Sequence, residues 1–208
     1  LTGLFLLYRQ LGTLSLDAMA AAAAGAEDRG LLWVGGLLVL VGFGAKAGAF
    51  PLHIWLPTAH PAAPAPASAV LSGVITKTGI YGVLVLSTTV FLHDKQWGML
   101  LAVLGAVTMV LGAVLAVLSV DLKRTLACSS ISQIGFILVG TAMLCLLGEH
   151  NALAVDGTIL HILNHSLIKM VLFPAAGIIH LTTHSFDLND IRGFGRGKPL
   201  LALVMGMP

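Results

Sequence analysis

Residues 31–60 read LLWVGGLLVLVGFGAKAGAFPLHIWLPTAH, and this stretch decides the fold. Its first part, residues 31–45, carries no charge, which is typical of a helix that crosses a membrane. Lys46 then places an ammonium group in these apolar surroundings, and Pro51 follows it closely. A proline inside a helix removes a backbone hydrogen bond and kinks or breaks the helix. The sequence therefore predicts a membrane helix that is interrupted beside a charged side chain.

The composition of the whole chain agrees with a membrane protein. Of its 208 residues, 57% are hydrophobic and only 10% are charged, whereas a soluble domain has about 25% charged residues. The 24 glycines are typical of helices that pack closely in a bilayer. The net charge of +2 gives no reason to expect a nucleic-acid partner. Cys128 and Cys145 lie in apolar runs, so we expect packing residues and no disulfide or metal site.

Apolar runs of roughly 20 residues are long enough to cross a bilayer as helices, and the chain has five, at about 32–56, 67–91, 98–120, 125–147 and 157–182. A short helix at the membrane surface is expected over 15–25, between Ser15 as N-cap and Gly25 as its end. Apolar runs also occupy residues 1–8 and the segment after Pro199. We predict an all-α, polytopic transmembrane helix bundle. Residues 1–208 would be one transmembrane domain fragment of a longer protein.

The basic residues of the loops give an orientation. Loops 57–66, 121–124 and 183–199 together hold five Lys and Arg residues, and loops 9–31, 92–97 and 148–156 hold three. Cytoplasmic loops carry the excess of positive charge in membrane proteins. The first group of loops is therefore expected in the cytoplasm.

Three lysines, Lys46, Lys77 and Lys169, lie near the centres of predicted spans. A lysine at the bilayer centre costs about 2.5–3.5 kcal/mol on insertion scales, so such residues are functional candidates by default. The acidic residues all lie in predicted loops or at helix ends, so fixed ion pairs cannot neutralise all three lysines. Burial favours the neutral form of a lysine. A group that loses and regains a proton suits a proton relay.

Two histidines stand near the third lysine. His161, His165 and Lys169 are spaced four residues apart, which places them on one helix face in a line of about 12 Å. Histidine exchanges protons near neutral pH, so the three residues predict a proton path. Metal binding is an alternative, but the zinc-protease pattern requires Glu after the first His, and Ile162 stands there. Histidines that simply pack in the bundle are a further alternative.

Three stretches resemble the antiporter-like membrane subunits of respiratory complex I, energy-converting hydrogenases and Mrp cation/proton antiporters. They are AKAGAFPLHIWLPTAHPAAPAPASAVLSGVITKTGIYG at 45–82, DLKRTLACSSISQIGF at 121–136 and HILNHSLIKMVLFPAAGIIH at 161–180. The resemblance implies an inverted-repeat fold of about fourteen helices, of which this chain would cover the sixth to the start of the twelfth. It also implies a glutamate before residue 1.

The resemblance also implies roles for individual residues. Lys46 matches the central lysine of the family's broken seventh helix, and Lys77 matches the basic residue of the eighth. His161, His165 and Lys169 match the proton path of the eleventh helix. Lys123, at the start of the tenth helix, and Pro51 and His53, at the break, would be supporting residues.

We therefore expect a proton-translocating subunit of a redox-driven complex, of the NADH:quinone oxidoreductase or hydrogenase type. The alternative is an Mrp-type cation/proton antiporter subunit, which would move sodium as well as protons. A structural bundle without conduction and a membrane metalloenzyme are weaker alternatives. No cofactor motif appears in the sequence, so redox chemistry is expected in partner subunits of the same membrane complex. The location would be the inner membrane of a bacterium or archaeon.

Overall fold

The computed structural model describes residues 1–26, 28–150 and 152–206. The described residues form ten α-helices, a π-helical stretch (η1) and a short 3-10 turn (η2), and no strand. In chain order they are α1 (Thr2–Leu11), α2 (Leu16–Ala24), α3 (Arg29–Ala47), α4 (Trp55–Ala62), α5 (Ala65–Val70), η1 (Leu71–Ile75), α6 (Thr76–Thr89), α7 (Lys95–Val117), α8 (Leu122–Leu146), η2 (Gly148–His150), α9 (Ala152–Thr183) and α10 (Pro199–Met205).

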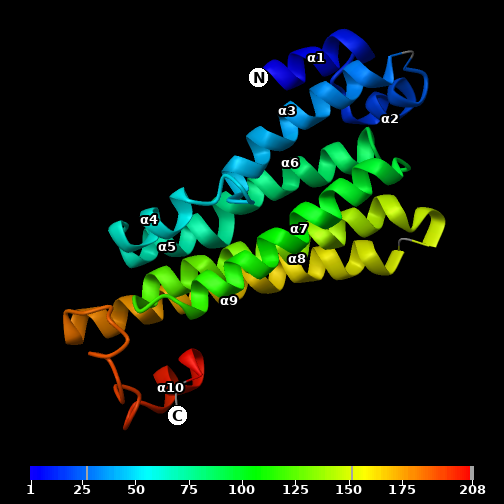
Figure 1. The fold of residues 1–208 in the computed structure, drawn as a ribbon. Coiled ribbons are helices and arrows are strands. Elements are labelled where there is room, and N and C mark those ends of the chain that lie inside the picture. The colour runs from blue at the N-terminus through cyan, green and yellow to red at the C-terminus, as the bar shows by residue number, and fades with distance from the viewer. Residues whose placement is uncertain (27, 151, 207–208) are drawn as a thin grey trace.

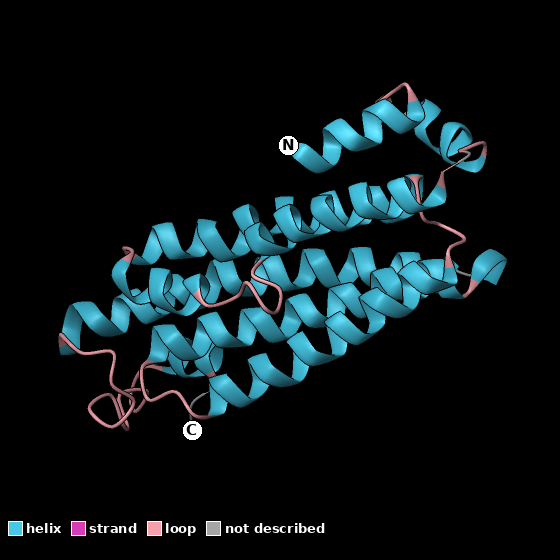
Figure 2. Ribbon diagram, turned by 45° about the horizontal axis from the view of Figure 1, so that its top comes forward, coloured by secondary structure: helices cyan, strands magenta, loops and turns pink. Residues whose placement is uncertain are grey.

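Five helical segments are long and apolar enough to cross a membrane, as predicted. They are Arg29–Ala47, Ala65–Thr89, Lys95–Val117, Leu122–Leu146 and Ala152–Thr183. These segments run side by side, and most loops lie at the two ends of the bundle (Figures 1 and 2). The expected all-α transmembrane class is therefore confirmed. The short helix expected over 15–25 is present as α2, which ends at Gly25.

Aspartate side chains cap the N-termini of three of the long helices. Asp28 accepts a hydrogen bond from the backbone N–H of Leu31, and Asp121 accepts one from Arg124. Asp94 accepts two, from the backbones of Gln96 and Trp97. Such N-caps satisfy backbone donors that have no partner inside the helix. These carboxylates thus lie at helix ends, away from the lysines at the centres of the spans.

The predicted break beside Lys46 is confirmed, although a glycine causes it. Helix α3 ends at Ala47, and Gly48 caps it with a φ of 83°, a left-handed conformation that glycine adopts at little cost. Pro51 lies in the turn that follows, and its peptide bond with Phe50 is cis. The prediction of a loop over residues 57–66 was wrong, because this segment contains most of α4. Pro57 did not prevent this helix, since proline is tolerated in the first helical turn.

Glycines allow α7 and α8 to approach each other closely. A Cβ on Gly105 would lie 2.9 Å from the carbonyl oxygen of Gly135, and one on Gly135 would collide with the backbone of Met109. A Cβ on Gly112 would meet the backbone of Ser132 in the same way. Small residues at such contacts are what brings membrane helices together. The many glycines of the sequence thus include three that set this helix pair.

The three loops that were predicted to share a membrane side lie at one end of the bundle. The backbone of Leu122 donates to the carbonyl of Phe186 at 2.8 Å, which joins the start of α8 to the loop after α9. Lys123 Nζ donates to the carbonyl of Ala63, between α4 and α5. The common end of these loops is therefore confirmed, and the side of the membrane on which they lie stays a prediction.

Candidate functional site

Two basic side chains from different helices meet inside the bundle. Lys77 Nζ on α6 lies 2.7 Å from His165 Nδ1 on α9. His165 is 3% exposed, and Lys77 is half-buried. At this distance a proton can pass directly between the amine and the ring, if the ring nitrogen carries a lone pair. The structure thus brings together two of the residues that the sequence predicted for a proton path.

A wide helical turn supplies a second contact to Lys77. The segment between α5 and α6 is a π-helix, η1, in which hydrogen bonds connect residues five apart. Lys77 Nζ donates to the backbone carbonyl of Ser72 at 2.9 Å, five residues earlier. The Ser72 hydroxyl in turn lies 2.8 Å from that of Ser130 on α8. The sequence analysis missed this turn, because hydropathy does not distinguish π-helix from α-helix.

Lys169 lies one helical turn beyond His165 and bonds to α8. Its Nζ donates to the carbonyl of Leu126 at 2.8 Å and to the hydroxyl of Ser129 at 2.6 Å. Lys169 is 3% exposed. His165 and Lys169 therefore share the buried face of α9 that their spacing predicted.

His161, the third member of the predicted line, is only half-buried. Its ring centroid lies 5.9 Å from that of Phe136. Its Nε2 is buried and has no hydrogen-bond partner in the described part of the chain. His161 thus lies next along the line, and among the described residues it has no hydrogen bond to the other two.

Lys46, on the broken helix, differs from this pair in its exposure. Lys46 is exposed in the last turn of α3, and the hydrogen bonds found among the described residues do not connect it to Lys77 or Lys169. Hydrogen bonds hold the backbone on both sides of the break. Trp55 Nε1 donates to the carbonyl of Ala45 at 2.8 Å, and the backbone of Phe50 donates to the Thr108 hydroxyl at 3.2 Å.

The two supporting residues predicted at the break differ in burial. Pro51 is exposed in the turn. His53 is buried, and its ring stacks on that of Phe50 with centroids 6.0 Å apart. Burial lowers the pKa of His53.

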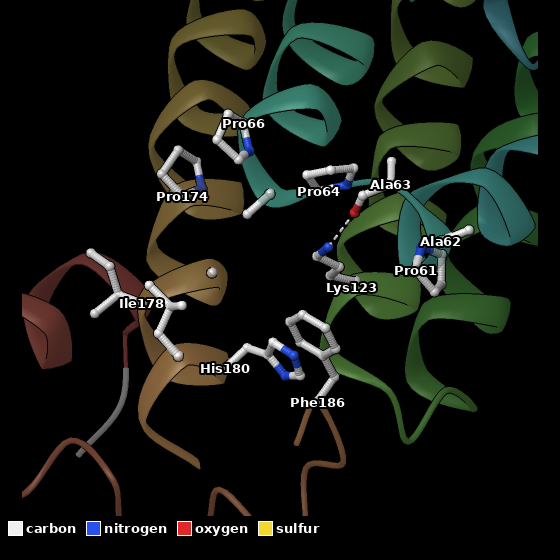
Figure 3. A pocket seen from close by; sticks show the side chains of 13 residues that line it. Pro61, Ala62, Ala63, Pro64, Pro66, Lys123, Pro174, Ile178, His180 and Phe186 are labelled. Carbon is white, nitrogen blue, oxygen red and sulfur yellow. Dashed lines mark hydrogen bonds between the residues drawn. The ribbon is translucent and has the colours of Figure 1, made fainter. Parts of the chain in front are cut away.

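A second group of basic side chains lies toward the end of the bundle where α8 begins. Lys123 is 2% exposed and donates to the carbonyl of Ala63 at 2.6 Å, beside a cavity of about 540 Å³ (Figure 3). His60 on α4 is fully buried and stacks on Phe173 of α9, with centroids 4.5 Å apart. Burial, together with the nearby charges of Lys169 and Lys123, lowers the pKa of His60 to about 4. The sequence analysis missed His60 because it assigned residues 57–66 to a loop.

The basic groups at the centre of the bundle have no acidic partner among the described residues. Among these residues, an ion pair joins Arg29 to Asp94 at 3.6 Å. Both lie at helix starts, at the end of the bundle opposite to the start of α8. Within the same residues, no group of three or more His, Cys, Asp and Glu side chains is placed to hold a metal ion. Lys77 and Lys169 are instead held by hydrogen bonds to backbone carbonyls and to a hydroxyl.

Known proteins share the fold and part of the sequence of this chain. The profile of the family described as "NADH:quinone oxidoreductase/Mrp antiporter, TM" matches residues 1–207. The chain belongs to this family. Its fold is antiporter-like, since it superimposes on a chain of the Mrp complex from Dietzia sp. DQ12-45-1b with a TM-score of 0.86 and 29% identity, covering 97% of this chain and 36% of that one.

Members of the NADH:quinone oxidoreductase/Mrp antiporter family with different names match this chain. Hydrogenase-4 component B of Escherichia coli (strain K12) is 41% identical over 174 residues, which are 80% of this chain and 26% of the relative. A Na(+)/H(+) antiporter subunit from Alkalihalophilus pseudofirmus is 34% identical over 203 residues, which are 97% of this chain and 40% of the relative. The chain thus spans less than half the length of these relatives.

Proposed function

We propose that this chain forms part of a proton-translocating subunit of a redox-driven membrane complex, of the NADH:quinone oxidoreductase or hydrogenase type. The observation that carries the proposal is the 2.7 Å contact between Lys77 Nζ and His165 Nδ1 inside the bundle. Groups that titrate are costly in a membrane and mark proton paths when they are found there. Protons would move between α6 and α9 in the middle of the membrane.

The proposed transfers begin at this pair and continue along α9. A protonated Lys77 gives one proton to His165 Nδ1, which breaks an N–H bond on the lysine and forms one on the ring. The ring then releases the proton of its Nε2 atom, which is buried and without a protein partner in the described residues. Lys169 lies one turn further and, when neutral, accepts that proton through an intervening water. His161 and Lys46 would extend the row in the two directions.

The redox-driven type is supported by the 41% identity to a hydrogenase component. The alternative is an Mrp-type antiporter subunit, which moves ions without electron transfer. It is supported by the likeness to the Mrp complex structure and by the relative named as part of a Na(+)/H(+) antiporter. Either way the partners would be other membrane subunits of a complex in the inner membrane of a bacterium or archaeon.

The relay is tested with the full-length protein in its complex, in inverted membrane vesicles. We expect Lys77→Ala to slow proton uptake at least tenfold, because His165 loses its donor. Lys95→Ala is the control, since Lys95 is exposed at the start of α7 and should leave the rate unchanged. Proton uptake is followed with a pH-sensitive dye and subunit content by immunoblot. Normal uptake by an assembled Lys77→Ala complex would contradict the relay.

The driving reaction is tested in the same vesicles. If the complex is redox-driven, adding NADH, formate or hydrogen in sodium-free buffer starts proton uptake. If it is an antiporter, uptake or release begins only when a sodium gradient is imposed. This second result would replace the redox proposal by the Mrp-type alternative.

A further inference from the structure

Two buried serine hydroxyls lie between the acceptors of the two central lysines. Ser72 on η1 and Ser130 on α8 are fully buried, and their hydroxyl oxygens are 2.8 Å apart. The backbone carbonyl of Ser72 accepts a hydrogen bond from Lys77 Nζ. The Ser130 hydroxyl lies 3.0 Å from the carbonyl of Leu126, which accepts one from Lys169 Nζ. The serine pair thus joins η1 to α8 at the residues that hold the two lysines.

The Leu126 carbonyl has more donors around it than it can accept. Lys169 Nζ lies at 2.8 Å, the Ser129 hydroxyl at 2.9 Å and the Ser130 hydroxyl at 3.0 Å. A carbonyl oxygen has two lone pairs, and inside an α-helix one of them bonds to the backbone N–H four residues further along. The side chains therefore compete for this oxygen. The Ser130 hydroxyl has a second acceptor within reach, the hydroxyl oxygen of Ser72.

A charge on Lys169 favours one outcome of this competition. A hydrogen bond from a charged donor is roughly twice as strong as one between neutral groups, so an ammonium on Lys169 displaces the Ser130 proton from the carbonyl. A hydroxyl has one proton to donate, and that of Ser130 then points to Ser72. When Lys169 is neutral, the Ser130 proton returns to the Leu126 carbonyl and Ser72 becomes the donor of the pair. The two hydroxyls thus have two arrangements of opposite direction.

We propose that the Ser72–Ser130 pair couples the charge of Lys169 to that of Lys77. With Lys169 charged, the Ser130 O–H bond points to η1, and its positive end opposes a charge on Lys77. With Lys169 neutral, the Ser72 O–H bond points away to α8, and this opposition is removed. The pair therefore disfavours the state in which both lysines are charged, so that protons pass one at a time. No proton crosses the serines, because carbon atoms separate the hydroxyl of Ser72 from its carbonyl.

Removing either hydroxyl tests this coupling, which rests on the proposed function. In vesicles that hold the full-length protein in its complex, we expect Ser72→Ala and Ser130→Ala each to slow proton uptake about threefold. The double variant should be no slower than the slower single variant, because both changes break the same link. Thr141→Val is the matched control, since Thr141 is buried on the same helix as Ser130 and its hydroxyl, within the described residues, bonds to the carbonyl of Ile137 alone.

The pH profile of uptake separates coupling from packing. At low pH both lysines are charged, Lys169 cannot accept a proton, and uptake falls. Each alanine variant makes the doubly charged state easier to reach, so we expect this fall to begin about half a pH unit higher than in the wild type. Thr141→Val should follow the wild-type curve. The other titratable groups that act on the two lysines are the same in all these variants, and they are His60, Cys128, His161 and His165.

Threonine returns a hydroxyl to either position. We expect Ser72→Thr or Ser130→Thr to have the wild-type pH profile and most of the wild-type rate, because the hydroxyl makes the link. Subunit content is checked by immunoblot in every variant. If neither threonine variant differs from the alanine variants, the hydroxyls are not the cause and the proposal fails.

The outcomes also separate the serine link from the relay. Slower uptake by assembled alanine variants without the change in pH profile would show a packing role, and a wild-type rate and profile would show no role. Either result overturns the link, and the relay stands if Lys77→Ala still slows uptake. If Lys77→Ala has normal uptake, the relay itself fails.

Discussion

Lys169 shows how a buried lysine is held where the described residues supply no acidic partner. Its amine donates to one hydroxyl, on Ser129, and to one carbonyl, on Leu126. Hydrogen bonds to charged groups stabilise by about 1.5–3 kcal/mol. Two such bonds offset part of the cost of the charge without fixing it, since neither acceptor is an anion. An ion pair with a carboxylate would hold the proton on Lys169 more strongly than these neutral acceptors do.

Removing the hydroxyl at position 129 tests how much this hydrogen bond contributes to holding the protonated amine of Lys169. We expect Ser129→Ala to slow proton uptake by about threefold to tenfold, because a loss of about 1 kcal/mol from the protonated state changes a rate by this amount. Thr88→Ala is the control, since the Thr88 hydroxyl bonds only to carbonyls of its own helix in the structure. Uptake is measured in inverted vesicles. An unchanged rate in Ser129→Ala would show that the Leu126 carbonyl alone suffices.

At the scale of elements, the interrupted helices place the chemistry. Helix α3 ends at Ala47, close to Lys46, and the π-helical stretch η1 directs the Ser72 carbonyl to Lys77. Helix breaks in membranes are tolerated where protein or water satisfies the freed backbone groups. Here Thr108 and Trp55 do so at the first break. The irregular backbone thus lies where the basic side chains are.

The contact of α7 and α8 is tested through its glycines. We expect Gly135→Ala to destabilise the protein by about 1–3 kcal/mol, because the added Cβ collides with the backbone of Met109 and overpacks the contact. Gly42→Ala is the matched control, since a Cβ there meets nothing within 4 Å. The measurement is the thermal unfolding midpoint of the full-length protein in detergent. Equal midpoints for the two variants would contradict the close approach.

The elements that could be predicted from the sequence are those with a strong physical signal. A run of twenty apolar residues has few alternatives in a bilayer, so all five spans were predicted, although the first ends earlier than expected, at Ala47. The spacing of His165 and Lys169 was enough to place both on one face. Their partners were not predictable, because Ser72 and Leu126 act through backbone carbonyls that every residue has. His60 was missed because the proline-rich segment around it was taken for a loop.

For the whole molecule, the two ends of the bundle differ in chemistry. One end gathers the loops that carry more basic residues, together with the cavity beside Lys123. The other holds the aromatic cluster of Trp33, Phe91 and Trp97 beside Asp94. Since basic loops face the cytoplasm, the cavity would open to the cytoplasm.

Labelling tests this orientation. Arg196→Cys and Lys95→Cys place single exposed thiols at the two ends. We expect an impermeant maleimide to label position 95 in intact cells and position 196 only in inverted vesicles. The native Cys128 and Cys145 are buried and should give little background. Labelling of position 196 in intact cells would reverse the orientation and the side on which the cavity opens.

The hydrogen bonds of Lys77, Lys123 and Lys169 to backbone carbonyls have a consequence for mutagenesis. Any amino acid can supply a carbonyl, so the side chains at positions 63, 72 and 126 are not what these lysines require. An alanine scan leaves all three carbonyls in place: position 63 is already alanine, and alanine at 72 or 126 tests only the side chain. Replacing the amide by an ester one residue further along weakens the carbonyl as an acceptor, and this backbone chemistry is what would reveal the partners of the lysines.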